Sequence, residues 1–530
     1  MSTTKTHTRD THTRDTHTRD THTDDRGAPT VGAPGAATLP GSRASVAAHG
    51  DNPHHARRWW ILAVLGVAQL MVILDVSIVN IALPSAQRDL GFSTDQRQWV
   101  VTAYALAFGS LLLLGGRIAD LFGRKRTLLV GLAGFAAASA VGGAATSFGM
   151  LVVARAAQGL FGALLAPAVL SLLTTTFTEP RERARAFGIY GAIAGTGGAV
   201  GLLLGGLLTE YLDWRWCMYV NLIFAVVALA GGTALLHHTP SDERPKLDLL
   251  GTITVSAGLF SLVYGFANAE THSWSAPGTW AFLLAGVVLV AVFVALQTRV
   301  AHPLLPMRVL IDRNRAGSYL TVFMAGVGMF GIFLFLTYYL QQNLGFSPVS
   351  TGLAFLPMVG GAMITSTIAS SLLLPRVGPR PLISLGMLAA AGGMLWLTAL
   401  NVHSTYATDI LSPLVIMGLG MGLSMAPAMS TATSGIEPHD AGVASATANV
   451  GQQVGGSIGT ALLSTIAASA TSSYLHGKTP TAEVLAHAAV HSYTTAFAWA
   501  AAIFAAGAII CGLLVRPGVP KTGAAAAVHM

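Results

Sequence analysis

From residue 57 to residue 516 the chain alternates long apolar runs with short polar connections. Most of these runs approach or exceed the roughly 20 residues that an α-helix needs to cross a hydrocarbon core of about 30 Å. The pattern predicts fourteen transmembrane helices, and this even number places both chain ends on one side of the membrane. The predicted ranges are 59–84, 98–117, 127–146, 150–177, 185–210, 216–236, 248–268, 279–297, 316–340, 350–373, 381–400, 409–432, 441–468 and 492–515.

Residues 1–56 break this pattern because they are polar. The pentapeptide Thr-His-Thr-Arg-Asp occurs three times between Thr6 and Asp20, and a Gly/Ala/Pro-rich stretch follows a fourth, altered copy. Such a segment cannot bury a core, so we expect a disordered tail. It also lacks the apolar core of a signal peptide, so the first span should remain in the mature protein.

Composition supports a multi-pass membrane protein. The chain is 52% hydrophobic and only 10% charged, whereas soluble domains carry about 25% charged residues. The net charge of +7 is spread over short loops, which indicates membrane orientation and no nucleic-acid partner. Fifteen Lys and Arg residues lie in the predicted connections on the side of the termini, against four on the other side. This bias predicts cytoplasmic termini in the cytoplasmic (inner) membrane.

A repeat divides the chain. Gly91-Phe92-Ser93 precedes the second helix and Gly123-Arg124-Lys125-Arg126 follows it, while Gly345-Phe346-Ser347 and Gly378-Pro379-Arg380-Pro381 bracket the tenth helix. Two parallel six-helix halves with an inserted helix pair explain this spacing, and two repeats around a central site are typical of transporters. The predicted division is 1–56 (tail), 57–240 (first half), 241–300 (inserted pair), 301–516 (second half) and 517–530 (tail).

The first helix carries Leu74-Asp75-Val76-Ser77-Ile78-Val79-Asn80-Ile81-Ala82-Leu83-Pro84. Asp75 is the only acidic residue that we place in the middle of a span, where a carboxylate costs at least about 2.5 kcal/mol. We predict that it carries protons; the alternative is a carboxylate that braces a neighbouring helix. Gln69 and Asn80 share a face with Ser77 beside it, and Asp75 points away from them. One face could then line a cavity while the other meets another helix.

The connection between the second and third helices reads Gly116-Arg117-Ile118-Ala119-Asp120-Leu121-Phe122-Gly123-Arg124-Lys125-Arg126. Glycine permits a tight turn, and Asp120 could pair with a guanidinium group or cap a helix. The alternative, a plain basic loop, explains the Arg-Lys-Arg cluster but not the Gly/Asp spacing. We therefore predict a conformational role for Gly116, Asp120, Gly123, Arg124 and Lys125.

Arg155 is the only basic residue that we place well inside a span, in the cytoplasmic third of the fourth helix. Gly159, Gly162 and Ala166 share its face, which allows close contact with another helix. An intramembrane Arg usually faces a cavity or a partner, so we predict a role in proton coupling; the alternative is snorkelling to the cytoplasmic surface.

The fifth helix holds glycines broadly on one face, at Gly191, Gly195, Gly198, Gly201 and Gly205. Glycine at this spacing lets helix backbones touch and lets a helix bend. We predict helix packing on this face and, as an added hypothesis, gating.

Taken together, these residues resemble the 14-helix drug:proton antiporter family of the major facilitator superfamily, the QacA/EmrB-like exporters. Residues 74–84 resemble its helix 1 signature, residues 116–125 its loop motif, and Arg155, Gln158, Gly159 and Gly162 its helix 4 motif. Residues 213–216 with Asn221 resemble its Trp-Arg-Trp stretch, and residues 451–459 its late glycine-rich helix. The chain departs from the family in helix 5, where Gly195 precedes Thr196 instead of proline.

The resemblance implies an all-α major facilitator fold and a proton-driven exporter of lipophilic small molecules such as antibiotics. Asp75 would exchange protons with substrate during alternating access, and Arg155 would take part in proton coupling. The protein would need no cofactor or metal and would work as a monomer in the lipid bilayer. Weak candidates for the substrate cavity are Gln69, Asn80, Gln158, Phe333 and Tyr338. The tenth helix has no carboxylate, unlike relatives that handle dications, which favours neutral, zwitterionic or monocationic substrates.

The sequence leaves one alternative function open and excludes another. A proton-coupled carrier of one metabolite, in either direction, has the same scaffold, since fold alone does not set function. A membrane enzyme or ATP-driven pump is rejected, because no His-Glu-x-x-His occurs and Gly477-Lys478-Thr479 lacks the earlier glycine of a phosphate-binding loop, Ser472 standing in its place.

Overall fold

The computed structural model describes residues 57–93, 96–177, 179–236, 248–272, 274–300, 303–436 and 441–518. The predicted tail 1–56 and residues 519–530 lie outside these ranges. Within them the protein is all-α, and fourteen helices are long and apolar enough to cross a membrane, as predicted.

The helices of the first part of the chain are α1 (Arg58–Leu90), α2 (Gln98–Phe122), α3 (Arg124–Gly143), α4 (Phe148–Thr176), α5 (Pro180–Tyr211), α6 (Trp216–Leu235), α7 (Leu249–His272) and α8 (Pro277–Gln297). Those that follow are α9 (Met307–Ile311), α10 (Arg313–Tyr338), α11 (Pro348–Ile368), α12 (Leu374–Val377), α13 (Pro379–Leu397), α14 (Leu411–Thr433), α15 (Ala441–Leu475) and α16 (Ala482–Leu514). Three π-helical turns, η3 (Tyr339–Asn343), η4 (Ala369–Leu373) and η5 (Tyr406–Ile410), adjoin α10, α11 and α14.

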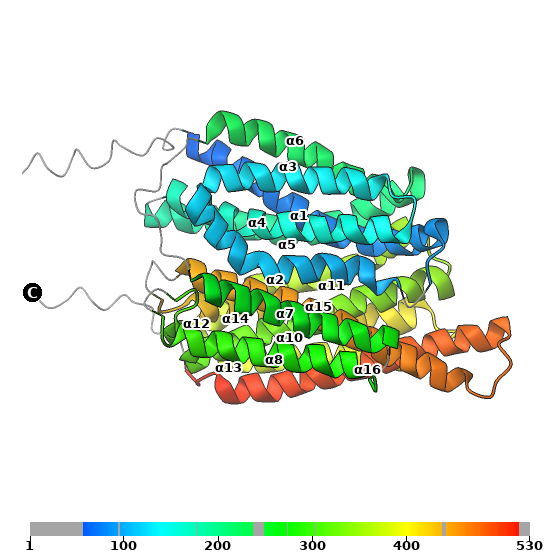
Figure 1. The fold of residues 1–530 in the computed structure, drawn as a ribbon. Helices are drawn as coiled ribbons and strands as arrows, with labels where there is room; N and C mark the ends of the chain where they lie inside the picture. Colours follow the sequence, from blue (N-terminus) through cyan, green and yellow to red (C-terminus); the bar gives the residue numbers. More distant parts are fainter. Residues whose placement is uncertain are drawn as a thin grey trace, which may run out of the picture. The chain divides into compact units, whose positions relative to one another are not determined.

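Several predicted boundaries were wrong because helices continue past their apolar runs, the largest differences being at α1, α15 and α16. Helix α1 passes through Pro84 to Leu90, and α16 begins at Ala482 rather than at residue 492. The Thr481 hydroxyl accepts a hydrogen bond from Val484 N and caps α16, which stabilises the earlier start of this helix. In Figure 1 the α15–α16 hairpin, in orange, projects beyond its neighbours.

The long helices alternate in direction (Figure 1). We call the end of the bundle where α1 begins the proximal end and the opposite end, where α1 finishes, the distal end. Helices α1–α6 pack on one another, as do α10, α11 and α13–α16. The two groups meet through α5 against α11, α2 against α15, and α1 against α10. Helices α7 and α8 form a pair, and α7 also contacts α2 and α15. The predicted domain limits themselves stay a prediction.

The repeat in the sequence corresponds to repeated backbone turns. Gly91 and Gly345 have φ of 68° and 66°, and Gly123 and Gly378 have φ of 91° and 77°. These left-handed conformations favour glycine, which lacks a Cβ. Equivalent turns therefore flank α2 and α11, where the repeated sequences occur.

Glycine sets the closest helix contacts. A Cβ at Gly159 of α4 would lie 2.3 Å from the Tyr104 backbone oxygen of α2. On α5, a Cβ at Gly201 would lie 2.7 Å from the Ser77 Cβ, and one at Gly205 would lie 3.0 Å from the Ile78 Cα. The predicted close approach therefore holds for these positions.

The prediction of close packing was wrong for Gly191 and Gly198. A Cβ at either position would meet no atom within 4 Å. Helix α5 contacts α1 along the line of Gly197, Gly201 and Gly205, and Gly191 and Gly198 lie away from this contact. The surroundings of Gly195 lie outside what the structure describes.

Candidate functional site

The Asp75 carboxylate lies at the centre of a buried polar cluster. Its Oδ2 accepts a hydrogen bond from Arg155 Nη1 at 2.5 Å, and its Oδ1 accepts from Gln158 Nε2 at 2.9 Å and from Asn221 Nδ2 at 2.8 Å. Asp75 is fully buried and Arg155 is 1% exposed. Helices α1, α4 and α6 thus supply one ion pair and two neutral donors to a single carboxylate, which we call the Asp75 cluster (Asp75, Arg155, Gln158 and Asn221).

The Arg155 guanidinium has further partners that fix its position. Its Nε donates to Val100 O at 3.1 Å and its Nη1 to Gln158 Oε1 at 2.8 Å. Its Cζ lies 4.5 Å from the centre of the Tyr104 ring. An aromatic face attracts a cation, most strongly where water is absent. Helix α2 therefore contributes a carbonyl and a ring to the same charge.

Gln158 also extends the cluster to α3. Its Nε2 donates to Ser139 Oγ at 2.7 Å as well as to Asp75. The cluster therefore connects five of the first six helices: α1, α2, α3, α4 and α6. A change in the charge of Asp75 would alter the hydrogen bonds of all of them.

The predicted depth of Arg155 was wrong. Helix α4 begins at Phe148, just after α3 ends at Gly143, so Arg155 lies two turns from the distal end rather than near the proximal end. Its partner Val100 stands at the distal start of α2, which begins at Gln98. The prediction did not take into account that α4 runs from the distal to the proximal end. Because the side chain is buried and paired inside the bundle, snorkelling is contradicted.

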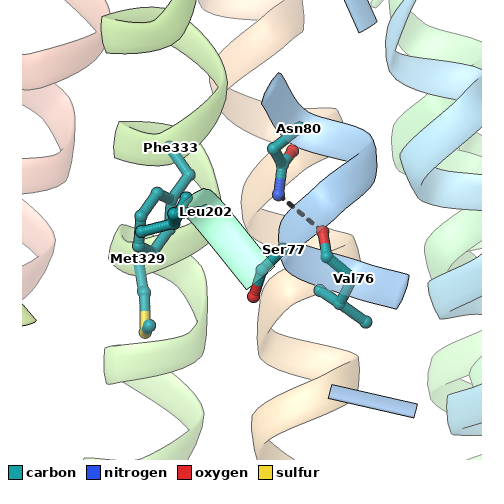
Figure 2. A pocket seen from close by; sticks show the side chains of 6 residues that line it. All are labelled: Val76, Ser77, Asn80, Leu202, Met329 and Phe333. Carbon is teal, nitrogen blue, oxygen red and sulfur yellow. Dashed lines mark hydrogen bonds between the residues drawn. The ribbon is translucent and has the colours of Figure 1, made fainter. Parts of the chain in front are cut away.

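A small cavity lies on the other face of α1 (Figure 2). Three helices line it: α1 with Val76, Ser77 and Asn80, α5 with Leu202, and α10 with Met329 and Phe333. Its volume is about 60 Å³, whereas pockets for drug-sized ligands measure about 300–1,000 Å³. The cavity must widen before such a molecule can enter.

The chemistry of this cavity is apolar with two neutral polar groups. Asn80 Nδ2 donates to Val76 O at 3.0 Å and Ser77 Oγ to Ile73 O at 3.2 Å, both within α1. None of the lining residues is charged, so the cavity suits an uncharged, lipophilic group. As predicted, the face of α1 with Asn80 lines a cavity while the face with Asp75 meets neighbouring helices.

Three predicted cavity residues lie elsewhere. Gln69 accepts a hydrogen bond from Tyr190 OH at 2.5 Å and does not line the cavity. Gln158 is fully buried within the Asp75 cluster. Tyr338 is fully buried too and donates to Gln87 Oε1 at 2.8 Å. Polarity and aromaticity alone did not reveal which helix each side chain faces.

The predicted loop between α2 and α3 is described in part. Gly123 makes the turn, and Lys125 Nζ donates to the carbonyls of Thr233 and Leu236 at the end of α6. A cation there compensates the free carbonyls of a helix terminus. Gly116 lies against Pro167, and within the described part of the chain Arg124 makes no contact that explains a special role. The side chain of Asp120 lies outside what the structure describes.

One residue of the Asp75 cluster, Asn221, was not predicted as a site residue and was noted only for its resemblance to a family motif. An amide inside an otherwise apolar run was the available signal for Asn221. No group of three or more His, Cys, Asp or Glu side chains placed to hold a metal occurs among the described residues.

Comparison with known proteins agrees with this architecture. The model of the Major Facilitator Superfamily matches residues 65–460. The chain is 51% identical over 475 residues to a puromycin resistance protein of Streptomyces alboniger, covering 89% of this chain and 93% of that protein. It is 38% identical over 416 residues to the cephamycin export protein CmcT of Amycolatopsis lactamdurans, covering 78% and 85%.

A solved structure shares the fold. The crystal structure of a bacterial homologue of the human lysosomal transporter Spinster, inward-facing and occupied, superposes with a TM-score of 0.60. The match covers 88% of this chain and 98% of that one, with 16% sequence identity. At this identity the likeness concerns the fold alone, which is the major facilitator fold.

Proposed function

The chain belongs to the major facilitator superfamily, and we propose that it exports lipophilic small molecules, antibiotics among them, in exchange for protons. Similarity to a puromycin resistance protein and to a cephamycin export protein supports the substrate class. The observation that carries the proposal is the position of Asp75. It is fully buried and lies one residue before the segment of α1 that lines the cavity.

In the proposed mechanism the proton binds to Asp75. The ionised carboxylate holds Arg155, Gln158 and Asn221 by three hydrogen bonds. A proton on one carboxylate oxygen removes the charge that attracts Arg155, and that oxygen becomes a donor. The contacts of α4 and α6 with α1 then weaken together.

Movement of α1 would transmit this change to the substrate. Val76, Ser77 and Asn80 follow Asp75 within two turns of the same helix and line the cavity. A shift or rotation of α1 after protonation therefore changes the width of the cavity. Substrate and proton need not share a site, because they meet opposite faces of α1. This coupling by conformation suits alternating access.

The energy source in this proposal is the proton gradient, with no cofactor. The proximal end would face the cytoplasm, since the basic connections gather there, and the protein would work as a monomer in the cytoplasmic membrane. A proton would reach Asp75 from the distal side and leave to the proximal side as substrate moves outward.

The decisive experiment is transport by the purified protein in liposomes with an imposed proton gradient, using puromycin first. We expect gradient-driven export by the wild type and at least a tenfold loss in Asp75→Asn, because the amide cannot carry the proton. Asp248→Asn is the matched control. Asp248 immediately precedes α7 and is also buried. It accepts hydrogen bonds from Gly251 N and from Gln297 of α8, away from the Asp75 cluster.

Each other outcome contradicts a different part of the proposal. Equal export by the wild type and by Asp75→Asn would remove Asp75 from the mechanism. If Asp248→Asn lowered export to the same degree, the loss of any buried carboxylate would explain the effect. No transport of any lipophilic compound by a well-folded wild type would favour a carrier dedicated to one metabolite.

A further inference from the structure

A second buried charge lies at the distal end, between helices from the two parts of the chain. Arg97 immediately precedes α2, and its Cζ lies 3.9 Å from the centre of the Tyr338 ring of α10. The Tyr338 hydroxyl donates to Gln87 Oε1 of α1 at 2.8 Å. Arg97 is only 6% exposed although it stands next to a connection, and Tyr338 is fully buried. We call Gln87, Arg97 and Tyr338 the distal latch.

The distal latch lies on the distal side of the cavity, as the order of residues along α1 and α10 shows. On α1 the cavity residues Ser77 and Asn80 are followed toward the distal end by Gln87. On α10 the cavity residue Phe333 is followed by Tyr338. A molecule that leaves the cavity between α1 and α10 toward the distal side must therefore pass the latch.

Neighbouring contacts close the same end. Gln341 Nε2, in η3, donates to Ile81 O of α1 at 3.1 Å. Glu210 at the end of α5 accepts a hydrogen bond from Val349 N of α11 at 3.0 Å. These contacts join the first and second parts of the chain on the distal side of the cavity.

Both helices that bear the latch contain a point where they can bend. Pro84 lies within α1 between the cavity and Gln87, and proline removes one helical hydrogen bond. Helix α10 changes to the π-helix η3 at Tyr339, immediately after Tyr338, and π-helical turns occur often at functional positions. Local bending could separate Tyr338 from Gln87 and Arg97 without unfolding either helix.

We propose that Gln87, Arg97 and Tyr338 form the outer gate of the transporter, which must open for substrate release. This inference rests on the proposed function because it assigns the distal end to the outside. The gate has a neutral hydrogen bond and a cation–ring contact. The gate can therefore close again without taking up or releasing the proton that Asp75 carries.

The test measures access to the cavity rather than transport. Asn80→Cys, in a background with Cys217→Ser and Cys511→Ser, serves as the reporter, and intact cells receive a membrane-impermeant thiol reagent from outside. We expect slow labelling with the latch intact. Tyr338→Leu removes both latch contacts and should raise the labelling rate at least tenfold. Tyr338→Phe retains the ring and should give an intermediate rate.

Tyr339 provides the matched control. It is fully buried next to Tyr338, but its hydroxyl donates to Asn401 O at 2.6 Å, within the second part of the chain. Tyr339→Leu and Tyr339→Phe should leave the labelling rate within twofold of the reporter alone. Arg97→Gln removes the cation–ring contact while the sequence of α10 stays unchanged, and it should also raise the rate.

Rates within twofold of the reporter in both Tyr338→Leu and Arg97→Gln would overturn the gate. An equal rise in the Tyr339 variants would overturn it as well, because general loosening would then explain the labelling. Thermal midpoints of all variants identify those that do not fold. Labelling needs no substrate, so a failed transport assay would not affect the test of the gate. If export occurs but the latch variants leave the labelling rate unchanged, only the gate is overturned and the proposed function stands.

Discussion

Asp75 accepts hydrogen bonds from one charged and two neutral donors, which the sequence pattern does not reveal equally well. Arg155 and Gln158 lie one turn apart on α4, whereas Asn221 lies 146 positions from Asp75 on α6. A hydrogen bond to a charged group contributes about 1.5–3 kcal/mol. Asn221 is therefore expected to act as a positioning residue for Asp75, the proposed proton carrier, although it carries no charge.

We predict that Asn221→Leu lowers proton-driven export by about 10–100-fold, because Asp75 loses a hydrogen bond that contributes about 1.5–3 kcal/mol to holding its carboxylate. The measurement is the initial export rate in liposomes as a function of pH, where a displaced pH profile separates a role at Asp75 from simple misfolding.

Asn268→Leu is the control for this prediction. Asn268 is a buried amide of α7 whose Nδ2 donates to Thr279 Oγ1 of α8 at 3.0 Å, outside the Asp75 cluster. Its removal should lower thermal stability without displacing the pH profile. Identical profiles for the two variants would deny Asn221 a role at the proton site.

At the scale of helices, the glycines of α5 are not equivalent. A Cβ at Gly201 would come within 2.7 Å of the Ser77 Cβ, and one at Gly198 would meet nothing within 4 Å. We predict that Gly201→Ala costs about 1–3 kcal/mol through overpacking against α1. Gly198→Ala should be neutral or stabilising by up to about 1 kcal/mol, through helix propensity. Thermal unfolding of both variants in the same detergent tests the difference, and equal midpoints would contradict it.

The same helix shows what a single sequence could and could not predict. Spacing correctly indicated that α5 has a face of small residues, since helical periodicity depends only on neighbours in the chain. It did not indicate where α1 crosses that face, because the crossing depends on side chains of both helices. Gly201 and Gly205 therefore matched the prediction, while Gly191 and Gly198 did not.

The candidate site divides in a similar way. Asp75 and Arg155 stood out because charge inside a span is costly, and the structure pairs them. Gln158 and Tyr338 were placed in the wrong surroundings because neutral polar and aromatic side chains are tolerated in several environments. The depth of Arg155 was mistaken because helix direction had to be followed through four spans.

For the whole molecule, the orientation in the membrane decides which end of the bundle is the outer gate. The basic residues of the connections favour a cytoplasmic proximal end. Arg126 in the first turn of α3 and Lys478 between α15 and α16 are both exposed and lie at opposite ends. Cysteine substitutions at these two positions are matched reporters, since each one replaces an exposed cation.

We predict that an impermeant thiol reagent labels Lys478→Cys in intact cells at least tenfold faster than Arg126→Cys, and that permeabilisation makes the two rates comparable. The buried native cysteines, Cys217 and Cys511, should contribute little signal. The reverse pattern would place the distal latch on the cytoplasmic side. Protons would then reach Asp75 from the cytoplasm, and the same geometry would describe import instead of export.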